Sequence, residues 1–228
     1  MHAPPSDCAA AFADLVGRRV AVRAFLPDPL PRADIARALE LACGAPSNCN
    51  TQPWLIAVAS GAARDRLAAA IGGEIGQGRM RPDLPYDGRY DGIHRERQLD
   101  AAEALYRSLG IAREDKAGRQ AQFMRNYAFF GAPHVAFFFL PAAFGVREAA
   151  DLGMCAQTFM LALASLGYGS CPQTSLSFHP DLVRAEFGIE AGAQLLFGVS
   201  FGRPDPAAAV NTVRVARDVA RCTRIRED

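Results

Sequence analysis

Apolar residues along the chain follow two patterns, a helical spacing and short unbroken runs. The helical spacing is clearest where Ile35, Leu39 and Ala42 share one face and Gly44 ends the segment. The same spacing predicts helices over residues 7–16, 31–43, 62–71, 95–109, 116–130, 147–166 and 180–187. Apolar runs predict strands over residues 54–59, 134–140 and 195–201. Helices interrupted by single, widely separated strands favour an α+β fold with a small sheet, as one domain over residues 1–228.

Two segments depart from this pattern. Residues 72–95 are dominated by Gly, Pro, Arg, Tyr and Asp, which predicts a long irregular loop of the kind that forms lids and binding loops. Residues 205–228 are rich first in Pro and Ala and then in Arg. The end of the chain looks too polar to pack alone, so we expect a C-terminal tail, or an arm that lies on a partner subunit.

A third stretch, residues 152–180, contains no Asp, Glu, Lys or Arg. Several polar uncharged residues, and two glycines in its second half, interrupt it, which favours a buried helix, a turn and a short strand over a membrane span. A dimer interface would give such a helix one of the neighbours it needs. The N-terminus lacks a basic-then-apolar leader, so we expect a cytoplasmic protein with reduced thiols.

Charge and composition exclude several classes of function. Lys and Arg number 25 against 24 Asp and Glu, and this balance argues against a nucleic-acid partner. The only lysine, Lys116, lies in a charged run, which argues against lysine-based covalent chemistry. The six cysteines form no C-x-x-C pair and the four histidines are scattered singly, so we expect no metal site.

Two glycine motifs resemble a hydrolase nucleophile elbow and a nucleotide phosphate loop, but the residues around them argue against both functions. Residues 198–202 match G-x-S-x-G, but Ser200 lies inside an apolar run and no histidine follows His179, unlike a hydrolase elbow. Residues 72–78 are glycine-rich but match neither nucleotide phosphate-loop pattern.

An arginine pair near the N-terminus is a candidate anion site. If residues 18–25 are extended, Arg19 and Arg23 lie on one side of the strand. Two guanidinium groups on one face suit a phosphate. A solvated basic edge is the alternative, and the segment alone does not decide between them.

The stretch 45–54 joins a predicted helix to a predicted strand. It places Ser, Asn, Thr and Gln side chains between two prolines, A-P-S-N-C-N-T-Q-P-W. A stiff loop of donors and acceptors suits a planar heterocycle. An ordinary polar loop is the alternative reading of its composition.

Together these two segments resemble the nitroreductase family, dimeric flavin enzymes that use FMN. Residues 19–25 match the flanking arginines and the Phe of the family motif R-R-S-x-R-x-F, but depart from it at Val20 and Ala21. Residues 45–54 meet the motif A-P-S-x-x-N-x-Q-P-W in full. Residues 126–133, 171–174 and 211–217 resemble three further family motifs, so that the likeness covers about residues 12–219. The nearest branch contains nitrobenzoate reductases.

The resemblance implies a small, mainly antiparallel sheet flanked by helices, in an intertwined homodimer with FMN at the interface. The phosphate would be bound by Arg19, Arg23 and either Arg214 or Arg217. The opposite chain would bring Pro46, Ser47, Asn48 and Asn50 to the flavin ring and ribityl chain. Asn126 would meet the pyrimidine edge, and the turn with Pro172, Gln173 and Thr174 would cover a ring face and aim a backbone N–H at flavin N5.

The implied activity is ping-pong reduction of nitroaromatic, including nitrobenzoate, or quinone substrates, with NADH or NADPH as electron donor. The slot would be lined by Tyr86, Tyr90, Arg95 and Phe123, and no side chain need act as catalytic acid or base. Other flavin chemistry on this fold, as a dehydrogenase, dehalogenase or flavin-cleaving enzyme, stays open. So does a flavin-binding protein without turnover, because Val20 and Ala21 remove two expected phosphate donors. We expect no nucleic-acid or membrane partner.

Overall fold

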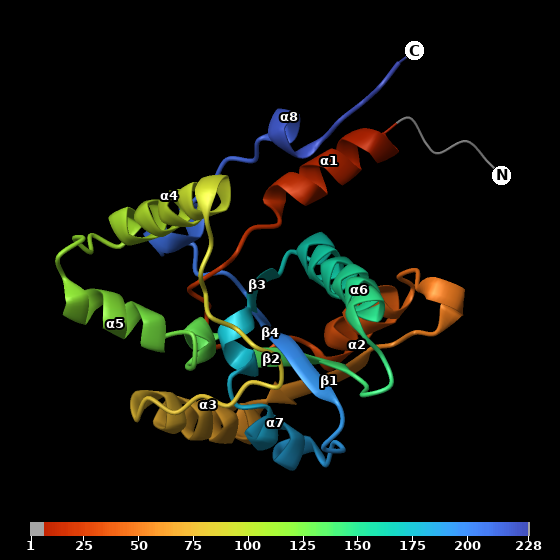
Figure 1. Ribbon diagram of the computed structural model, residues 1–228, viewed down its shortest axis with the longest axis horizontal. Helices are drawn as coiled ribbons and strands as arrows, with labels where there is room; N and C mark the ends of the chain where they lie inside the picture. The colour runs from red at the N-terminus through yellow and green to blue at the C-terminus, as the bar shows by residue number, and fades with distance from the viewer. Residues whose placement is uncertain (1–6, 228) are drawn as a thin grey trace.

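The computed structural model describes residues 7–227 (Figure 1). Residues 1–6 and 228 of the expected single domain lie outside this part. The helices are α1 (Cys8–Arg18), α2 (Arg32–Cys43), α3 (Gly61–Gly76), α4 (Gly92–Ser108), α5 (Lys116–Met124), α6 (Val146–Ser165), α7 (Pro180–Phe187) and α8 (Val219–Cys222). The strands are β1 (Leu55–Ser60), β2 (His134–Leu140), β3 (Gly169–Gln173) and β4 (Gln194–Gly202). Four short 3₁₀ turns complete the described chain: η1 (Asn48–Asn50), η2 (Phe129–Gly131), η3 (Thr174–Ser177) and η4 (Ala209–Thr212).

The four strands form one sheet in the order β1-β2-β4-β3, and every neighbouring pair is antiparallel. Strand β2 lies in the middle because all seven of its residues, H-V-A-F-F-F-L, are buried. An apolar strand without a polar face needs cover on both sides of the sheet. The predicted α+β class with a small antiparallel sheet is therefore confirmed.

The two faces of the sheet carry separate hydrophobic clusters. Side chains alternate along β2, so that Phe137 and Phe139 pack on the cluster of α3 and α7, while Phe138 and Leu140 pack on that of α2 and α6. Figure 1 shows these two helix pairs on opposite sides of the strands. Helices α4 and α5 project away from both layers.

Helix α6 is the buried helix that the sequence predicts. Leu152, Phe159 and Leu163 are fully buried on its inner face, against α2 and the sheet. Met154, near the middle of α6, and Leu166, directly after its last residue, are exposed in the single chain. Among the helices of residues 7–227, none has the length and hydropathy needed to cross a bilayer.

The irregular loop is shorter than residues 72–95, because helix α3 continues through Gly72 and Gly73 to Gly76. Leu67, Ile71 and Ile75 are buried at a four-residue spacing, and this burial outweighs a cost of about 1 kcal/mol for each helical glycine. Helix α4 begins at Gly92. The segment without helix or strand is therefore 77–91.

Helix α5 also differs from the prediction, since it ends at Met124 and not at residue 130. Phe129 and Phe130 have φ of 55° and 54°, in the left-handed region that bulky residues rarely adopt. The Arg64 guanidinium from α3 donates to the carbonyls of Ala128 (2.6 Å) and Ala132 (3.0 Å) on either side of this turn. These contacts from a distant helix stabilise the break.

Candidate functional site

Arg18 ends helix α1, and the following residues 19–25 form two isolated β-bridges, one of them to Ser170 of the edge strand β3. The Val22 N–H donates to the Ser170 carbonyl at 3.0 Å, and the Leu26 N–H donates to the Arg203 carbonyl at 2.9 Å. These bonds fix the backbone on either side of Arg23, at Val22 and at Leu26.

Asn211 attaches the beginning of the C-terminal arm to this segment. Its Oδ1 accepts the Arg23 N–H at 2.8 Å, and its Nδ2 donates to the Ala24 carbonyl at 2.9 Å. Arg214 lies three residues further on and donates to the Asn211 carbonyl at 3.0 Å. The first part of the arm is thus fixed to its own chain, and it carries Arg214 to the N-terminal arginines.

A cavity of about 270 Å³ lies where these segments meet. Its lining comprises Arg18, Arg19, Val20, Val22, Ala164, Gly167, Tyr168, Gly169, Ser170, Pro204, Asn211 and Arg214. Three guanidinium groups and no carboxylate are in that set, which suits a phosphate dianion. Of the predicted phosphate ligands, Arg19 and Arg214 line the cavity, whereas Arg23 and Arg217 do not.

Arg23 lies outside the cavity lining, but its charge, like that of Arg19, acts on the buried Cys171 of β3. Burial raises the pKa of the Cys171 thiol to about 11, and the positive charges of Arg23 and Arg19 oppose that rise. Both arginines therefore act on one point of β3. Arg217 instead bonds the carbonyl of Val215 at 2.6 Å, on the exposed arm.

The loop that carries the second motif is ordered by its own hydrogen bonds. The Ser47 hydroxyl accepts the Gln52 N–H at 3.0 Å, and the carboxylate of the buried Asp151 in α6 accepts the Asn48 N–H at 3.0 Å. Cys49 and Asn50 have φ of 50° and 56°. Pro46, Asn48 and Asn50 are exposed, while Ser47 is half-buried. The Asn48 and Asn50 side chains thus face outward on a strained loop, an arrangement that is common where a protein binds a ligand.

Helix α6 separates this loop from the arginine cavity. Asp151, which holds the loop, lies near the start of α6, whereas Ala164, which lines the cavity, lies near its end. The two residues are 13 positions apart, or about 20 Å along a helix. One chain therefore presents the two motif regions at opposite ends of its longest helix.

Asn126 and Gln173 contact each other directly. Gln173 Nε2 donates to the Asn126 carbonyl at 3.0 Å and to its Oδ1 at 3.2 Å. Gln173 is buried. Pro172 and Gln173 belong to strand β3 and not to the expected turn, which begins at Thr174 in η3. Pro172 and Thr174 are exposed beside it.

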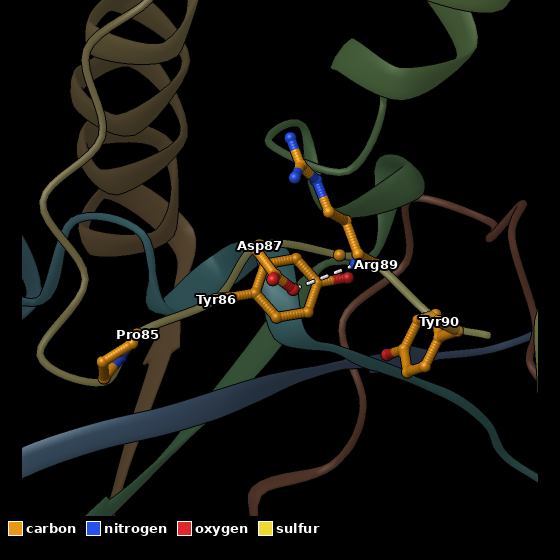
Figure 2. A pocket seen from close by; sticks show the side chains of 6 residues that line it. Pro85, Tyr86, Asp87, Arg89 and Tyr90 are labelled. Carbon is orange, nitrogen blue, oxygen red and sulfur yellow. Dashed lines mark hydrogen bonds between the residues drawn. The ribbon is translucent and has the colours of Figure 1, made fainter.

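A second cavity, of about 520 Å³, lies in the irregular segment (Figure 2). Its walls are residues 85–90, with Tyr86 and Tyr90 both about half exposed. The ring of Tyr86 lies 5.6 Å from that of Phe178, and burial and the neighbouring Tyr90 raise the Tyr86 pKa. In Figure 2 the Arg89 side chain points away from both tyrosine rings.

The other two predicted slot residues lie outside this lining. Arg95 is on α4, where it donates to Gln98, and Phe123 is on α5 with its ring 5.5 Å from that of Tyr127. Arg89 is the arginine that lines the cavity, and sequence reasoning did not select it. The glycine- and tyrosine-rich run gave no spacing that could distinguish one arginine from another.

The comparison with known proteins agrees with this architecture. The model of the nitroreductase family matches residues 16–203. A relative from Mycolicibacterium smegmatis, nitroreductase NfnB, is 47% identical over 215 residues, which cover 94% of this chain and 92% of the relative. A 4-nitrobenzoate reductase from Pseudomonas putida is 35% identical over 92% of each chain.

A solved structure shares the fold almost throughout. The crystal structure of the FMN-dependent nitroreductase NfnB from Mycobacterium smegmatis in complex with NADPH superposes with a TM-score of 0.93 at 46% identity. The match covers 97% of this chain and 100% of that one. With its sheet, its motif loops and its arginine segment in the arrangement described above, this chain belongs to the nitroreductase family.

Proposed function

We propose that the protein is an FMN-dependent NAD(P)H oxidoreductase that reduces nitroaromatic compounds. The observation that carries the proposal is the 270 Å³ cavity lined by Arg18, Arg19 and Arg214. The relatives described as FMN-dependent nitroreductase and 4-nitrobenzoate reductase support the same cofactor and substrate class.

The cavity fits the phosphate end of FMN. Arg19 and Arg214 bind the phosphate, and Arg23 adds positive charge from the same extended segment. Val20 lines the cavity with an apolar side chain. Arg18, beside it, supplies a third guanidinium group that offsets the missing polar donor.

The site needs two copies of the chain. Since the arginine cavity and the 46–52 loop lie at opposite ends of α6, the loop that serves one cofactor comes from the partner subunit in a homodimer. Exposed apolar side chains on α1 and α6, including Phe12, Val16 and Met154, support such an interface. Pro46, Ser47, Asn48 and Asn50 then bind the ring and ribityl chain of the opposite site.

The remaining residues orient cofactor and substrate. Asn126 binds the pyrimidine edge, while Pro172 and Thr174 cover one ring face. Tyr86, Tyr90 and Phe123 bind the aromatic substrate, and Arg89 or Arg95 pairs with a substrate carboxylate.

Bound at this site, FMN would supply the two-electron chemistry that links hydride donation by NADPH or NADH to reduction of the nitro group, with protons taken from water. The side chains of this chain bind and orient, and none has to act as acid, base or nucleophile. Among residues 7–227 all six cysteines are unpaired, which supports a location in the reducing cytoplasm.

The test is spectroscopic. We expect the purified protein to carry a flavin band near ~450 nm that bleaches under anaerobic addition of NADPH or NADH and returns with 4-nitrobenzoate. A protein that takes up no FMN overturns the proposal. A protein that binds FMN but is never bleached by either nucleotide is a flavin-binding protein without turnover. Bleaching that only quinones, and no nitroaromatic compound, reverse identifies a different oxidoreductase.

A further inference from the structure

A buried chain of hydrogen bonds leads from the central sheet to Asn126. The hydroxyl of Ser200, fully buried in β4, donates to Oε1 of Gln173 on the neighbouring strand β3. Gln173 Nε2 donates to the backbone oxygen and to Oδ1 of Asn126, and Asn126 Nδ2 donates to the Phe123 carbonyl at 2.8 Å. We propose that Ser200 and Gln173 are positioning residues that set the orientation of the Asn126 carboxamide for the cofactor. The proposal rests on the function proposed above.

Two backbone carbonyls, which only accept hydrogen bonds, determine which atom donates at each step of this series. The Asn126 carbonyl requires the amide nitrogen of Gln173 on its side, so Oε1 of Gln173 must face Ser200. The Phe123 carbonyl requires Nδ2 of Asn126, so Oδ1 of Asn126 must face Gln173. Each amide therefore has one favourable orientation, and the second N–H of Asn126 Nδ2 remains free for a ligand.

Burial makes the loss of any hydrogen bond in this series costly. Gln173 is 5% exposed and Ser200 is 0% exposed, so neither side chain reaches a cofactor directly. Loss of the Ser200 hydroxyl leaves Oε1 of Gln173 buried without a donor, which destabilises the orientation that Asn126 needs. This also explains a serine inside an apolar strand, where the G-x-S-x-G pattern suggests a nucleophile that the fold does not support.

The experiment measures FMN affinity by fluorescence titration of the apoprotein. We expect Gln173→Leu to raise the Kd for FMN about tenfold and Ser200→Ala to raise it about threefold, the range set by one neutral hydrogen bond. Ser200→Thr keeps the hydroxyl and should restore the wild-type Kd. Gln194→Leu, on the same strand as Ser200 but at its opposite end, is the matched control and should leave the Kd unchanged.

A double-mutant cycle separates positioning from general stability. If Gln173 acts through Asn126, the double variant Asn126→Ala/Gln173→Leu should bind FMN no more weakly than Asn126→Ala alone. The flavin midpoint potential provides a second measurement, because a donor at the pyrimidine edge stabilises the reduced ring. Gln173→Leu and Asn126→Ala should both lower it.

The outcomes distinguish this proposal from the one it rests on. Wild-type apoprotein that binds no FMN overturns the proposed function. FMN binding that is equal in the wild type, Gln173→Leu and Ser200→Ala overturns the positioning role alone. Losses that add in the double variant, or a Ser200→Thr variant as weak as Ser200→Ala, also overturn it.

Discussion

Arg184 and Asp83 form a two-pronged ion pair that holds the irregular segment against the body of the protein. The two nitrogen–oxygen distances are 2.7 and 3.1 Å, and both side chains are largely buried. The same carboxylate accepts the Leu195 N–H of β4 at 2.9 Å. The segment that carries Tyr86 and Tyr90 therefore begins at a fixed point on α7 and the sheet.

Replacing Asp83 by Ala should lower the free energy of unfolding by about 1–3 kcal/mol, because the buried Arg184 guanidinium keeps only Asp181 as a carboxylate partner and the Leu195 N–H loses its acceptor. The freed segment should also raise KM for nitroaromatic compounds more than it lowers kcat. Thermal unfolding and steady-state kinetics measure the two effects. As a control, Arg107→Ala breaks an exposed pair with Glu103 and should cost below about 0.5 kcal/mol. Equal losses in the two variants would contradict the anchoring role.

Removing the arginines of the phosphate cavity should weaken FMN binding unequally. Loss of a charge-assisted hydrogen bond in Arg19→Ala or Arg214→Ala should raise the FMN Kd about 10- to 100-fold. Arg217→Ala should change it less than about threefold, because that side chain bonds the arm and does not line the cavity. A larger effect for Arg217 than for Arg214 would reverse our assignment of the C-terminal phosphate ligand.

Gly169 gives a way to displace the arginine segment without touching an arginine. A Cβ at this position would lie 2.7 Å from Val22 Cγ2 and 2.8 Å from Pro204 Cγ, which is too close. We expect Gly169→Ala to cost about 1–3 kcal/mol of stability and to raise the FMN Kd about tenfold. Gly73→Ala meets nothing within 4 Å and should stabilise helix α3 by up to about 1 kcal/mol. Unchanged FMN affinity in Gly169→Ala would show that the segment tolerates displacement.

His134 should make the protein sensitive to mild acid. Its Nε2 accepts the Leu30 N–H at 2.8 Å, and burial lowers its pKa below the ordinary value of 6.5. Below pH 6.5 the histidine is protonated in the unfolded chain but stays neutral in the folded chain. The free energy of unfolding therefore falls as the pH falls, by up to about 1.4 kcal/mol per pH unit, until the pKa of the folded state is reached. Glu74 and Glu186 have pKa values lowered by their arginine partners, so protonation of these two groups reduces stability only below about pH 4.5.

Urea unfolding between pH 8 and pH 5 measures this dependence. His134→Gln should be less stable at pH 8, because it loses a buried contact, but its stability should change less across the range. A wild-type protein whose stability is flat between pH 6.5 and pH 5 would contradict the prediction.

Much of the fold could be predicted because local pattern and burial agree. The run of residues 134–140 is apolar throughout and becomes the central strand. The predicted helix over residues 147–166 becomes α6, because the apolar side chains of its uncharged part cover the sheet. Where pattern and propensity conflict, the prediction was wrong: Gly72 and Gly73 indicated an end to α3, but Ile75 extends the buried stripe by one more turn.

The candidate site was predictable where it lies in contiguous motifs. Arg19 and Arg214, which the motifs assign to one phosphate, line the same cavity, and the 46–52 loop has three residues with positive φ. Contacts between distant segments could not be read from the sequence. Arg64 bonds the turn after α5 at Ala128, 64 residues away along the chain, and the bond between Ser200 and Gln173 spans 27 residues without any periodic signal.

The separation of two ligand-binding regions by the length of α6 has a consequence for regulation by concentration. In the homodimer proposed above each site would draw on both subunits, so dissociation would empty both sites at once, and free FMN would in turn favour assembly. Specific activity should then fall on dilution and recover with added FMN. The concentration of free flavin in the cell would in that way set the fraction of the protein that is dimeric and active.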